Sequence, residues 1–419
     1  MAKHRKLRNT RIGPLATAAV AVGISAPLAV GHAVDASAEP RDLVIGVGGA
    51  LNPTSDRVRD KFRGELVADL EAAGYTFEGV QYSAWPLPID PSVAEGVPKL
   101  HTAIDGADGG RVVVIGYSEG ALVAEQVRRD LSPATGGPAR DDLQFVLIAS
   151  PFVPNGGIYA RFPGLRLPGF TSTGPTQPSE YDTTYYSREY DLVADFPAYG
   201  NPLSLANAVV GFLYFHGDHG VDPVDLETQP TSVREVVNGK GGKDVYILIR
   251  AEHLPLLQPL RDISALTGTT VFTEPVLGAV EPALRVLVDM GYTDRDYRTI
   301  GVDEAADYQD ADRPTRFSPV IPAERVRQTA EALPAAIRDG LENLVDAVTP
   351  KPAKPTPKTT KPEEDEDEDE ALTSRLEDDS EADPEESDAS DASDDSADAP
   401  TDDDSTDAPS EASDTAAAA

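Results

Sequence analysis

The residues from Arg111 to Gln126 constrain the fold most strongly, because they read as a strand, a sharp turn and a helix in immediate succession. The stretch from Val112 to Ile115 consists of four apolar residues, three of them valine, and such a run is typical of a strand buried on both faces of a parallel sheet. The sequence GYSEG follows as a G-x-S-x-G motif, and Ala121 to Ala124 continue at helical spacing. In this context the motif predicts a nucleophile elbow with Ser118 at the turn.

The residues around Ser118 also predict how negative charge is stabilised beside it. Gly116 and Gly120 have no Cβ atom, so the strand and the helix can approach each other closely. The N-terminus of the helix favours the charge that develops on the reacting oxygen, and the Glu119 backbone amide lies at that end. In α/β-hydrolases a loop after an early strand supplies a second amide, which we assign to Ala50. The glycines of that loop lack the G-x-G-x-x-G order, and no cofactor is predicted.

Strands and helices alternate along much of the chain. Strands are predicted over residues 41–49, 75–82, 143–149, 183–190 and 244–250. Helices are predicted over 58–74, 91–106, from Asn201 onward, 276–290 and 323–348, the last interrupted by Pro334. The alternation predicts an α/β fold of the α/β-hydrolase type, with a mainly parallel sheet and helices on both faces.

The segment 151–178 is rich in glycine, proline and aromatic residues and has almost no regular period. A loop of that length inside a compact domain is usually functional. It follows a predicted sheet strand directly, so one interpretation is a wall or lid for an acyl group. The other interpretation is a mobile surface insertion.

Both ends of the chain differ in character from the middle. Residues 1–38 have a basic start, a charge-free apolar segment and an Ala-Ser-Ala site, which together predict a secretory signal peptide. Residues 39–300 are predicted to be the catalytic domain and 301–349 a helical extension. Residues 350–362 read as a Pro/Lys-rich linker and 363–419 as a disordered acidic tail.

Net charge and composition limit the classes of partner that the chain is expected to bind. The formal net charge is −36, and residues 362–419 hold 26 acidic residues against one basic residue. Residues 39–349 are also acidic, so the balance argues against nucleic acid as a partner. The chain has no cysteine, so an exported fold must be stabilised by core burial. We expect secretion, no transmembrane segment in the mature chain, and cell-envelope association through the tail.

A serine nucleophile needs a histidine base and a carboxylate that orients the base. In α/β-hydrolases these residues follow the serine in the order acid, then histidine, which leaves His216, His219 and His253 as bases. Asp191 ends a predicted strand and so projects beside Ser118, whereas Asp195 lies one turn further and reads as a capping residue. Sheet order alone selects His253, because this histidine follows the last clear strand.

Five stretches, in order along the chain, resemble the PE-PPE domain of mycobacteria and related actinobacteria, a cutinase-like α/β-hydrolase module. They are GYSEGALVAEQ, REYDLVADFP, NPLSLANAVVGFLYFHGDHG, VYILIRAEHLPLLQPLR and VEPALRVLVDMGY. The resemblance covers roughly residues 43–292. It implies a serine esterase, or an acyltransferase acting on cell-envelope lipids. It places the nucleophile at Ser118, the acid at Asp191 and the base at His216, whereas the sheet order keeps His253 as the alternative base.

The chain departs from these families at several positions. His219 stands where the PE-PPE family more often has tyrosine, and Glu119 stands where cutinases carry glutamine. A negative side chain at Glu119 is expected to weaken the oxyanion hole or to move the pH optimum. The resulting hypothesis is a secreted serine hydrolase acting on acyl esters or lipids without a metal. The alternatives are acyl transfer between cell-envelope glycolipids and a non-catalytic, envelope-associated binding protein on a hydrolase scaffold.

Overall fold

The computed structural model describes residues 39–293 and 308–349. Its central element is a seven-stranded sheet with the strand order β2-β1-β3-β4-β7-β9-β8, in which every pair is parallel except β8 with β9. The strands of this sheet are β1 (Leu43–Val47), β2 (Thr76–Gly79), β3 (Val112–Tyr117), β4 (Leu143–Ile148), β7 (Asp182–Arg188), β8 (Thr231–Val237) and β9 (Lys243–Ile249). The predicted fold class, a mainly parallel α/β sheet with helices, is therefore confirmed.

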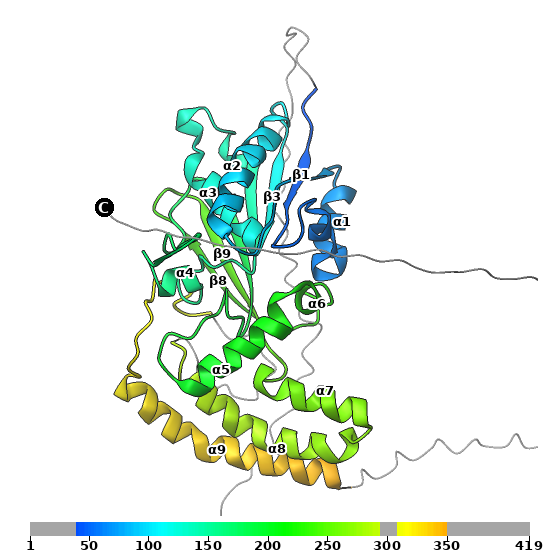
Figure 1. Ribbon diagram of the computed structural model, residues 1–419, viewed down its shortest axis with the longest axis vertical. Helices are drawn as coiled ribbons and strands as arrows, with labels where there is room; N and C mark the ends of the chain where they lie inside the picture. Colours follow the sequence, from blue (N-terminus) through cyan, green and yellow to red (C-terminus); the bar gives the residue numbers. More distant parts are fainter. Residues whose placement is uncertain (1–38, 294–307, 350–419) are drawn as a thin grey trace, which may run out of the picture. The chain divides into compact units, whose positions relative to one another are not determined.

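The α-helices alternate with the strands and then follow them (Figure 1). They are α1 (Glu65–Ala72), α2 (Ile89–Asp105), α3 (Glu119–Asp130), α4 (Ile158–Arg161), α5 (Pro202–Gly211), α6 (Asp218–Val221), α7 (Gln258–Thr267), α8 (Thr270–Asp289) and α9 (Ala323–Val348). Shorter helical turns are η1 (Asp56–Gly64), η2 (Pro133–Thr135), η3 (Arg140–Asp142), η4 (Phe212–His216) and η5 (Pro255–Leu257). A small hairpin is formed by β5 (Arg166–Leu167) and β6 (Phe170–Thr171).

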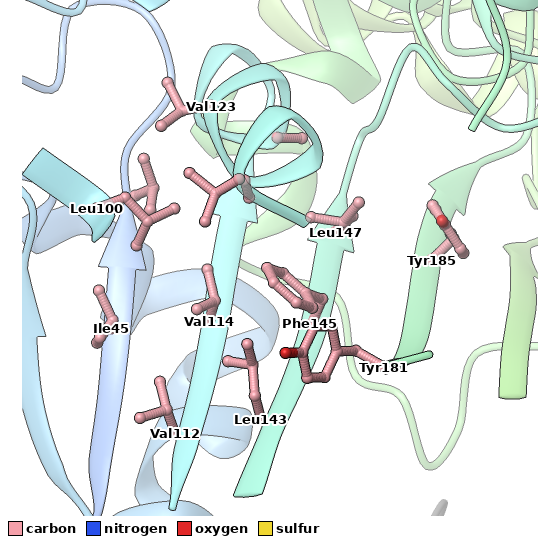
Figure 2. Packing of buried hydrophobic residues seen from close by; sticks show 14 of the residues in the cluster. Ile45, Leu100, Val112, Val114, Val123, Leu143, Phe145, Leu147, Tyr181 and Tyr185 are labelled. Atoms are coloured by element: carbon pink, nitrogen blue, oxygen red, sulfur yellow. The ribbon is translucent and has the colours of Figure 1, made fainter. Parts of the chain in front are cut away.

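The central strands are buried on both faces, because their alternate residues pack into two hydrophobic cores, one on each face of the sheet. On one face Ile45 and Val114 pack with Leu100 of α2 and Val123 of α3 (Figure 2). On the other face Val44 and Val113 pack with residues of η1 and α1, including Phe62 and Leu70. Helices therefore cover both faces, and the carboxyl ends of the parallel strands lie along one edge.

The helices after the sheet form their own packed group. Helices α8 and α9 run antiparallel, since Arg325 donates to the Asp289 carbonyl at 2.7 Å and Asn343 donates to the Gly278 carbonyl at 3.2 Å. Gly340 sits against the Ala279 backbone, where a Cβ atom would lie 1.9 Å from the carbonyl oxygen. Helix α9 continues through Pro334, so the predicted interruption there is wrong. The boundary proposed near residue 300 falls in a segment outside the described residues.

Other elements also differ from the expectations based on the sequence. The helix predicted over 58–74 is two elements, because the backbone leaves helical geometry at residues 61–63 and Phe62 and Arg63 have φ of 55° and 60°. Strand β8 was not predicted, since its sequence TSVREVV mixes charged and apolar residues. It lies at the sheet edge, where one face meets solvent and polar residues are tolerated.

Several predicted segments lie outside the described residues. These are the signal peptide at 1–38, the linker at 350–362 and the acidic tail at 363–419. Among the residues that the structure describes, no helix is both long enough and apolar enough to cross a membrane.

Candidate active site

Ser118 lies at the tight turn between β3 and α3, as the sequence predicts. Its backbone has φ 53° and ψ −112°, a conformation that costs free energy and is found mainly at functional turns. The turn is tight because Gly120 touches the end of β1, where a Cβ atom would lie 2.0 Å from the Val47 carbonyl oxygen. A Cβ atom on Gly116 would lie 2.7 Å from the Gly120 carbonyl oxygen. Both glycines are therefore required by the close approach of strand and helix.

The structure brings Ser118, His216 and Asp191 together in one hydrogen-bonded chain. Ser118 Oγ lies 2.8 Å from His216 Nε2. On the other side of the ring, His216 Nδ1 lies 2.9 and 3.0 Å from the two carboxylate oxygens of Asp191. Asp191 is fully buried and His216 is 7% exposed, so the pair is shielded from water. This is the geometry in which a carboxylate orients an imidazole toward a hydroxyl.

The helix that precedes His216 fixes the position of its ring. Asn201 caps the start of α5 by accepting a hydrogen bond from the Leu203 amide at 3.0 Å. The helix continues into η4, a single π-helical turn that ends at His216. The Phe212 ring stacks on the imidazole, with 5.0 Å between the ring centroids. Tyr117, next to the nucleophile, donates to the His216 backbone carbonyl.

Asp191 is held by the loop that follows β7. Its Oδ1 accepts a hydrogen bond from the Val193 amide at 3.0 Å. Asp195 accepts from the Tyr190 amide at 2.8 Å, and Tyr190 has a left-handed φ of 68°. Asp195 thus stabilises the turn that presents Asp191, in agreement with its predicted capping role. Gly211 packs against this turn, because a Cβ atom there would lie 2.1 Å from the Tyr190 carbonyl oxygen.

The other candidate histidines lie in different surroundings. His253 Nδ1 lies 3.2 Å from Glu281 Oε2, within an ion cluster that includes Arg261 and Arg285. Burial alone would raise the pKa of Glu281, but the hydrogen bond from His253 and the neighbouring arginines lower it to about 2. His219 Nε2 lies 2.6 Å from the Leu213 carbonyl oxygen. His253 and His219 therefore have partners that fit structural roles.

The two residues predicted to supply the oxyanion-hole amides, Ala50 and Glu119, both belong to segments next to Ser118. Glu119 is the first residue of α3, and the first amides of a helix have no acceptor within the helix. Ala50 belongs to the loop after β1, which passes so close that a Cβ atom on Gly49 would lie 3.2 Å from Ser118 Cβ. Ala50, Ser118 and Glu119 line the same cavity.

This cavity has a volume of about 510 Å³ and an apolar wall to which the segment after β4 contributes. Ile158 and Tyr159 of α4 and Phe170 of β6 contribute to that wall, and Leu122 of α3 packs against them. The segment 151–178 is thus part of the cavity lining, which fits the interpretation as a wall. At another part of the lining, Arg57 donates to Asp218 at 2.5 Å, so a polar pair borders the cavity.

Sequence reasoning missed a buried lysine beneath the site. Lys61 is 1% exposed and its Nζ lies 2.8 Å from Asp218 and 2.6 Å from Asp222. The same Nζ lies 4.5 Å from the centroid of the Tyr117 ring. These contacts link η1 to the segment after His216, at the residue where the backbone leaves helical geometry. No signal in the sequence identifies Lys61, because it stands one position before Phe62 in an otherwise amphipathic run.

The Glu119 side chain is unusual among the groups around Ser118. It is 3% exposed, and the Ser92 hydroxyl is a hydrogen-bonding neighbour of its carboxylate. Burial raises the pKa of Glu119 to about 7, with the Ser92 hydroxyl acting in the opposite sense. Glu119 therefore combines two properties. Its backbone amide follows the nucleophile directly in the chain, and the pKa of its carboxyl group is close to neutral pH.

The burial of Glu119 predicts a pH dependence of stability. Between its ordinary pKa of 4.5 and about 7, the folded chain keeps a proton that the unfolded chain has released. The free energy of unfolding therefore falls as pH rises through this window and levels off above it. In thermal melts of wild type and Glu119→Gln, we expect the Tm of the variant relative to wild type to increase from pH 5 to pH 8.

The matched control is Glu227→Gln, which makes the same substitution at a surface position. Glu227 is exposed, so the relative Tm of Glu227→Gln should not vary with pH in the same way. Burial also raises the pKa of Asp244 to about 6, but Asp244 is present in all three proteins and its titration cancels in the differences. A relative Tm of Glu119→Gln that is constant between pH 5 and pH 8 would contradict the raised pKa.

Comparison with known proteins identifies relatives of the chain. The sequence model of the PE-PPE domain family matches residues 75–293 of this chain. Esterase PE16 of Mycobacterium tuberculosis is 39% identical over 274 residues, which are 62% of this chain and 49% of the relative. Diacyltrehalose acyltransferase Chp2 of the same organism is 30% identical, over 52% of this chain and 64% of the relative. The chain thus spans less than two thirds of the length of either protein.

Among solved structures, a cutinase-like protein from Cryptococcus sp. is similar to part of the chain. It is 21% identical, with a TM-score of 0.23, over 28% of this chain and 57% of that structure.

Proposed function

This chain belongs to the PE-PPE domain family, and we propose that it is a serine hydrolase that cleaves acyl esters through Ser118, His216 and Asp191. The observation that carries the proposal is the hydrogen-bonded chain of these three side chains at the wall of an apolar cavity. A relative that bears the name esterase PE16 supports the same reaction class.

In the proposed reaction, Ser118 Oγ attacks the carbonyl carbon of the ester and its proton passes to His216 Nε2. Asp191 accepts a hydrogen bond from His216 Nδ1 and stabilises the positive ring. The negative oxygen of the tetrahedral intermediate accepts hydrogen bonds from the amides of Ala50 and Glu119. His216 then protonates the leaving alcohol, and an acyl group remains on Ser118. Water attacks this acyl-enzyme by the same steps in reverse order and releases the acid.

Acyl transfer is the second candidate, because a relative is named an acyltransferase. The acyl-enzyme is common to both reactions, and only the attacking group differs. The polar pair Arg57 and Asp218 borders the cavity and offers hydrogen bonds to an alcohol, whether leaving or attacking. Product analysis with and without added acceptor alcohol separates the two: a new ester indicates transfer, and free acid alone indicates hydrolysis.

We expect the purified protein to hydrolyse p-nitrophenyl esters of short and medium acyl length and to react covalently with a fluorophosphonate probe. The reason is that a serine hydroxyl hydrogen-bonded to an oriented histidine is an activated nucleophile. Release of p-nitrophenol and the mass of the labelled protein measure the two properties. Absence of both reactions in a folded sample would favour the remaining alternative, a non-catalytic binding protein on a hydrolase scaffold.

We also propose that the protein acts outside the cytoplasm. The composition of residues 1–38 supports export, and the acidic composition of residues 363–419 supports a role in solubility or retention at the cell envelope. Cleavage after Ala38 is testable by N-terminal sequencing of the exported protein.

A further inference from the structure

Lys61 is a buried cation that the proposed reaction does not use. Its side chain is 1% exposed, and its Nζ lies 2.8 Å from Asp218 Oδ1 and 2.6 Å from Asp222 Oδ1. The same Nζ donates to the Arg57 carbonyl oxygen at 3.1 Å. An ammonium group has three N–H donors, so each of its donors has an acceptor. These three acceptors fix the position of the charge within the fold.

On one side, Lys61 supports the residue next to the nucleophile. Lys61 Nζ lies 4.5 Å from the centroid of the Tyr117 ring, where the ring face attracts a cation. Tyr117 directly precedes Ser118, and its buried hydroxyl donates to the backbone carbonyl of His216. Burial and the nearby charge of Asp218 raise the pKa of Tyr117, so the hydroxyl keeps the proton that it donates. Contact with Lys61 therefore reaches the catalytic histidine through a single tyrosine.

On the other side, Lys61 supports the segment that follows the catalytic histidine. Asp218 is the first residue of α6 and stands two positions after His216. Asp222 directly follows the last residue of α6. Because both carboxylates pair with Lys61, the short helix after His216 is tied to η1 at each of its ends.

The contact between Ser118 Oγ and His216 Nε2 depends on both of these supports. The two residues are 98 positions apart in the chain, and their side-chain atoms lie 2.8 Å from each other. A general base must lie within hydrogen-bond reach of the proton that it accepts. A misplacement of about 1 Å in a catalytic site can lower the rate about a hundredfold. A group that holds both segments therefore controls how well this proton transfer is set up.

We propose that Lys61 is a positioning residue that keeps Ser118 within hydrogen-bond distance of His216. It acts through Tyr117 on one side of this contact and through Asp218 on the other. This inference rests on the proposed function. Lys61 supports the two segments that carry the reacting side chains, so its loss slows the chemical step more than it weakens substrate binding.

The test measures kcat per fluorophosphonate-labelled site in wild type and in Lys61→Met. We expect kcat per labelled site to fall about 10- to 100-fold in the variant. KM should change by less than about threefold, because Asp218 keeps Arg57 as its partner at the border of the cavity. A role in stability alone would lower the fraction of protein that is labelled at completion and leave kcat per labelled site unchanged. That second result would overturn the proposal.

Arg63→Met is the matched control. Arg63 lies two positions after Lys61 and pairs with Asp225 at 2.6 Å, so it also ties η1 to the segment after α6. Its side chain is 52% exposed. We expect this variant to keep the wild-type kcat per labelled site. An equal loss in Arg63→Met and Lys61→Met would contradict the proposal, because any loosening of η1 would then slow the reaction.

Tyr117→Phe decides the question if Lys61→Met does not fold. This substitution keeps the ring above Lys61 and removes the hydroxyl that donates to His216. An unchanged kcat per labelled site in folded Tyr117→Phe would overturn the proposed route to the histidine.

Failure of the proposed function gives a different result, since wild type would then neither hydrolyse esters nor react with the probe. Crystal structures of wild type and of the folded variant still decide in that case. The distance between Ser118 Oγ and His216 Nε2 should exceed hydrogen-bond reach in the variant. A distance that stays at the 2.8 Å of wild type would contradict the inference.

Discussion

Replacing Ser118 with alanine is expected to lower kcat by at least about a thousandfold and to abolish labelling by fluorophosphonates. The substitution removes the only atom that forms the covalent bond in the proposed reaction, and triad nucleophiles lose activity on this scale or larger. The amides of Ala50 and Glu119 remain, so weak residual activity is consistent with the mechanism. Initial rates with a p-nitrophenyl ester and intact-protein mass spectrometry measure the two effects.

The fold should survive this change, because Ser118 contributes one partly buried hydroxyl whose neighbour His216 keeps its bond to Asp191. Circular dichroism and the melting temperature serve as the control. Undiminished labelling of a folded Ser118→Ala protein would show that another residue is the nucleophile, and the assignment of the whole site would then be wrong.

Replacing His216 with alanine is expected to cost nearly as much as replacing Ser118. Residues of a triad act as a unit, so the double variant should lose little more than either single variant. In contrast, alanine at His219 or His253 should cost at most about tenfold, because their hydrogen bonds go to Leu213 and Glu281. The measurement is kcat/KM of the four single variants and the double variant with the same ester.

His253 requires its own folding control. Its loss leaves Glu281 with Arg261 and Arg285 as partners, so some loss of stability is expected without loss of the active site. Stability and rate must therefore be measured on the same sample. An inactive but folded His253→Ala protein beside an active His216→Ala protein would contradict the assignment and restore the base chosen from sheet order.

Much of the fold was predictable because the strongest signals are local. The run of apolar residues before GYSEG predicts a buried strand whatever surrounds it, and β3 is found at Val112–Tyr117. Asn201 followed by Pro202 predicts a helix start, and α5 begins there with Asn201 as its cap. In both cases the residues that determine the element lie within the element or next to it.

The choice among three histidines was not fixed by local signals. The position of a histidine in the sequence does not determine where its ring lies in the folded protein. His253 follows the last central strand, but its ring meets Glu281 of α8. The resemblance to the PE-PPE domain selected His216, and that ring is the one within hydrogen-bond distance of Ser118.

Other features depend on partners far away in sequence. Lys61, where the predicted helix breaks, contacts Asp218 and Asp222, more than 150 residues later. The burial of the Glu119 carboxyl group likewise becomes visible only when every neighbour is placed. Periodicity carries no information about such contacts.

The π-helical turn η4 has a consequence for how members of this family can diverge. His216 is the last residue of a helical run that starts at Pro202, and both ends of that run are anchored, by Asn201 at one end and by Tyr117 at the other. Inserting or deleting one residue between these anchors rotates the imidazole by about 100° around the helix axis, away from Ser118. We therefore expect a one-residue insertion or deletion between these anchors to remove the hydrogen bond between Ser118 and His216.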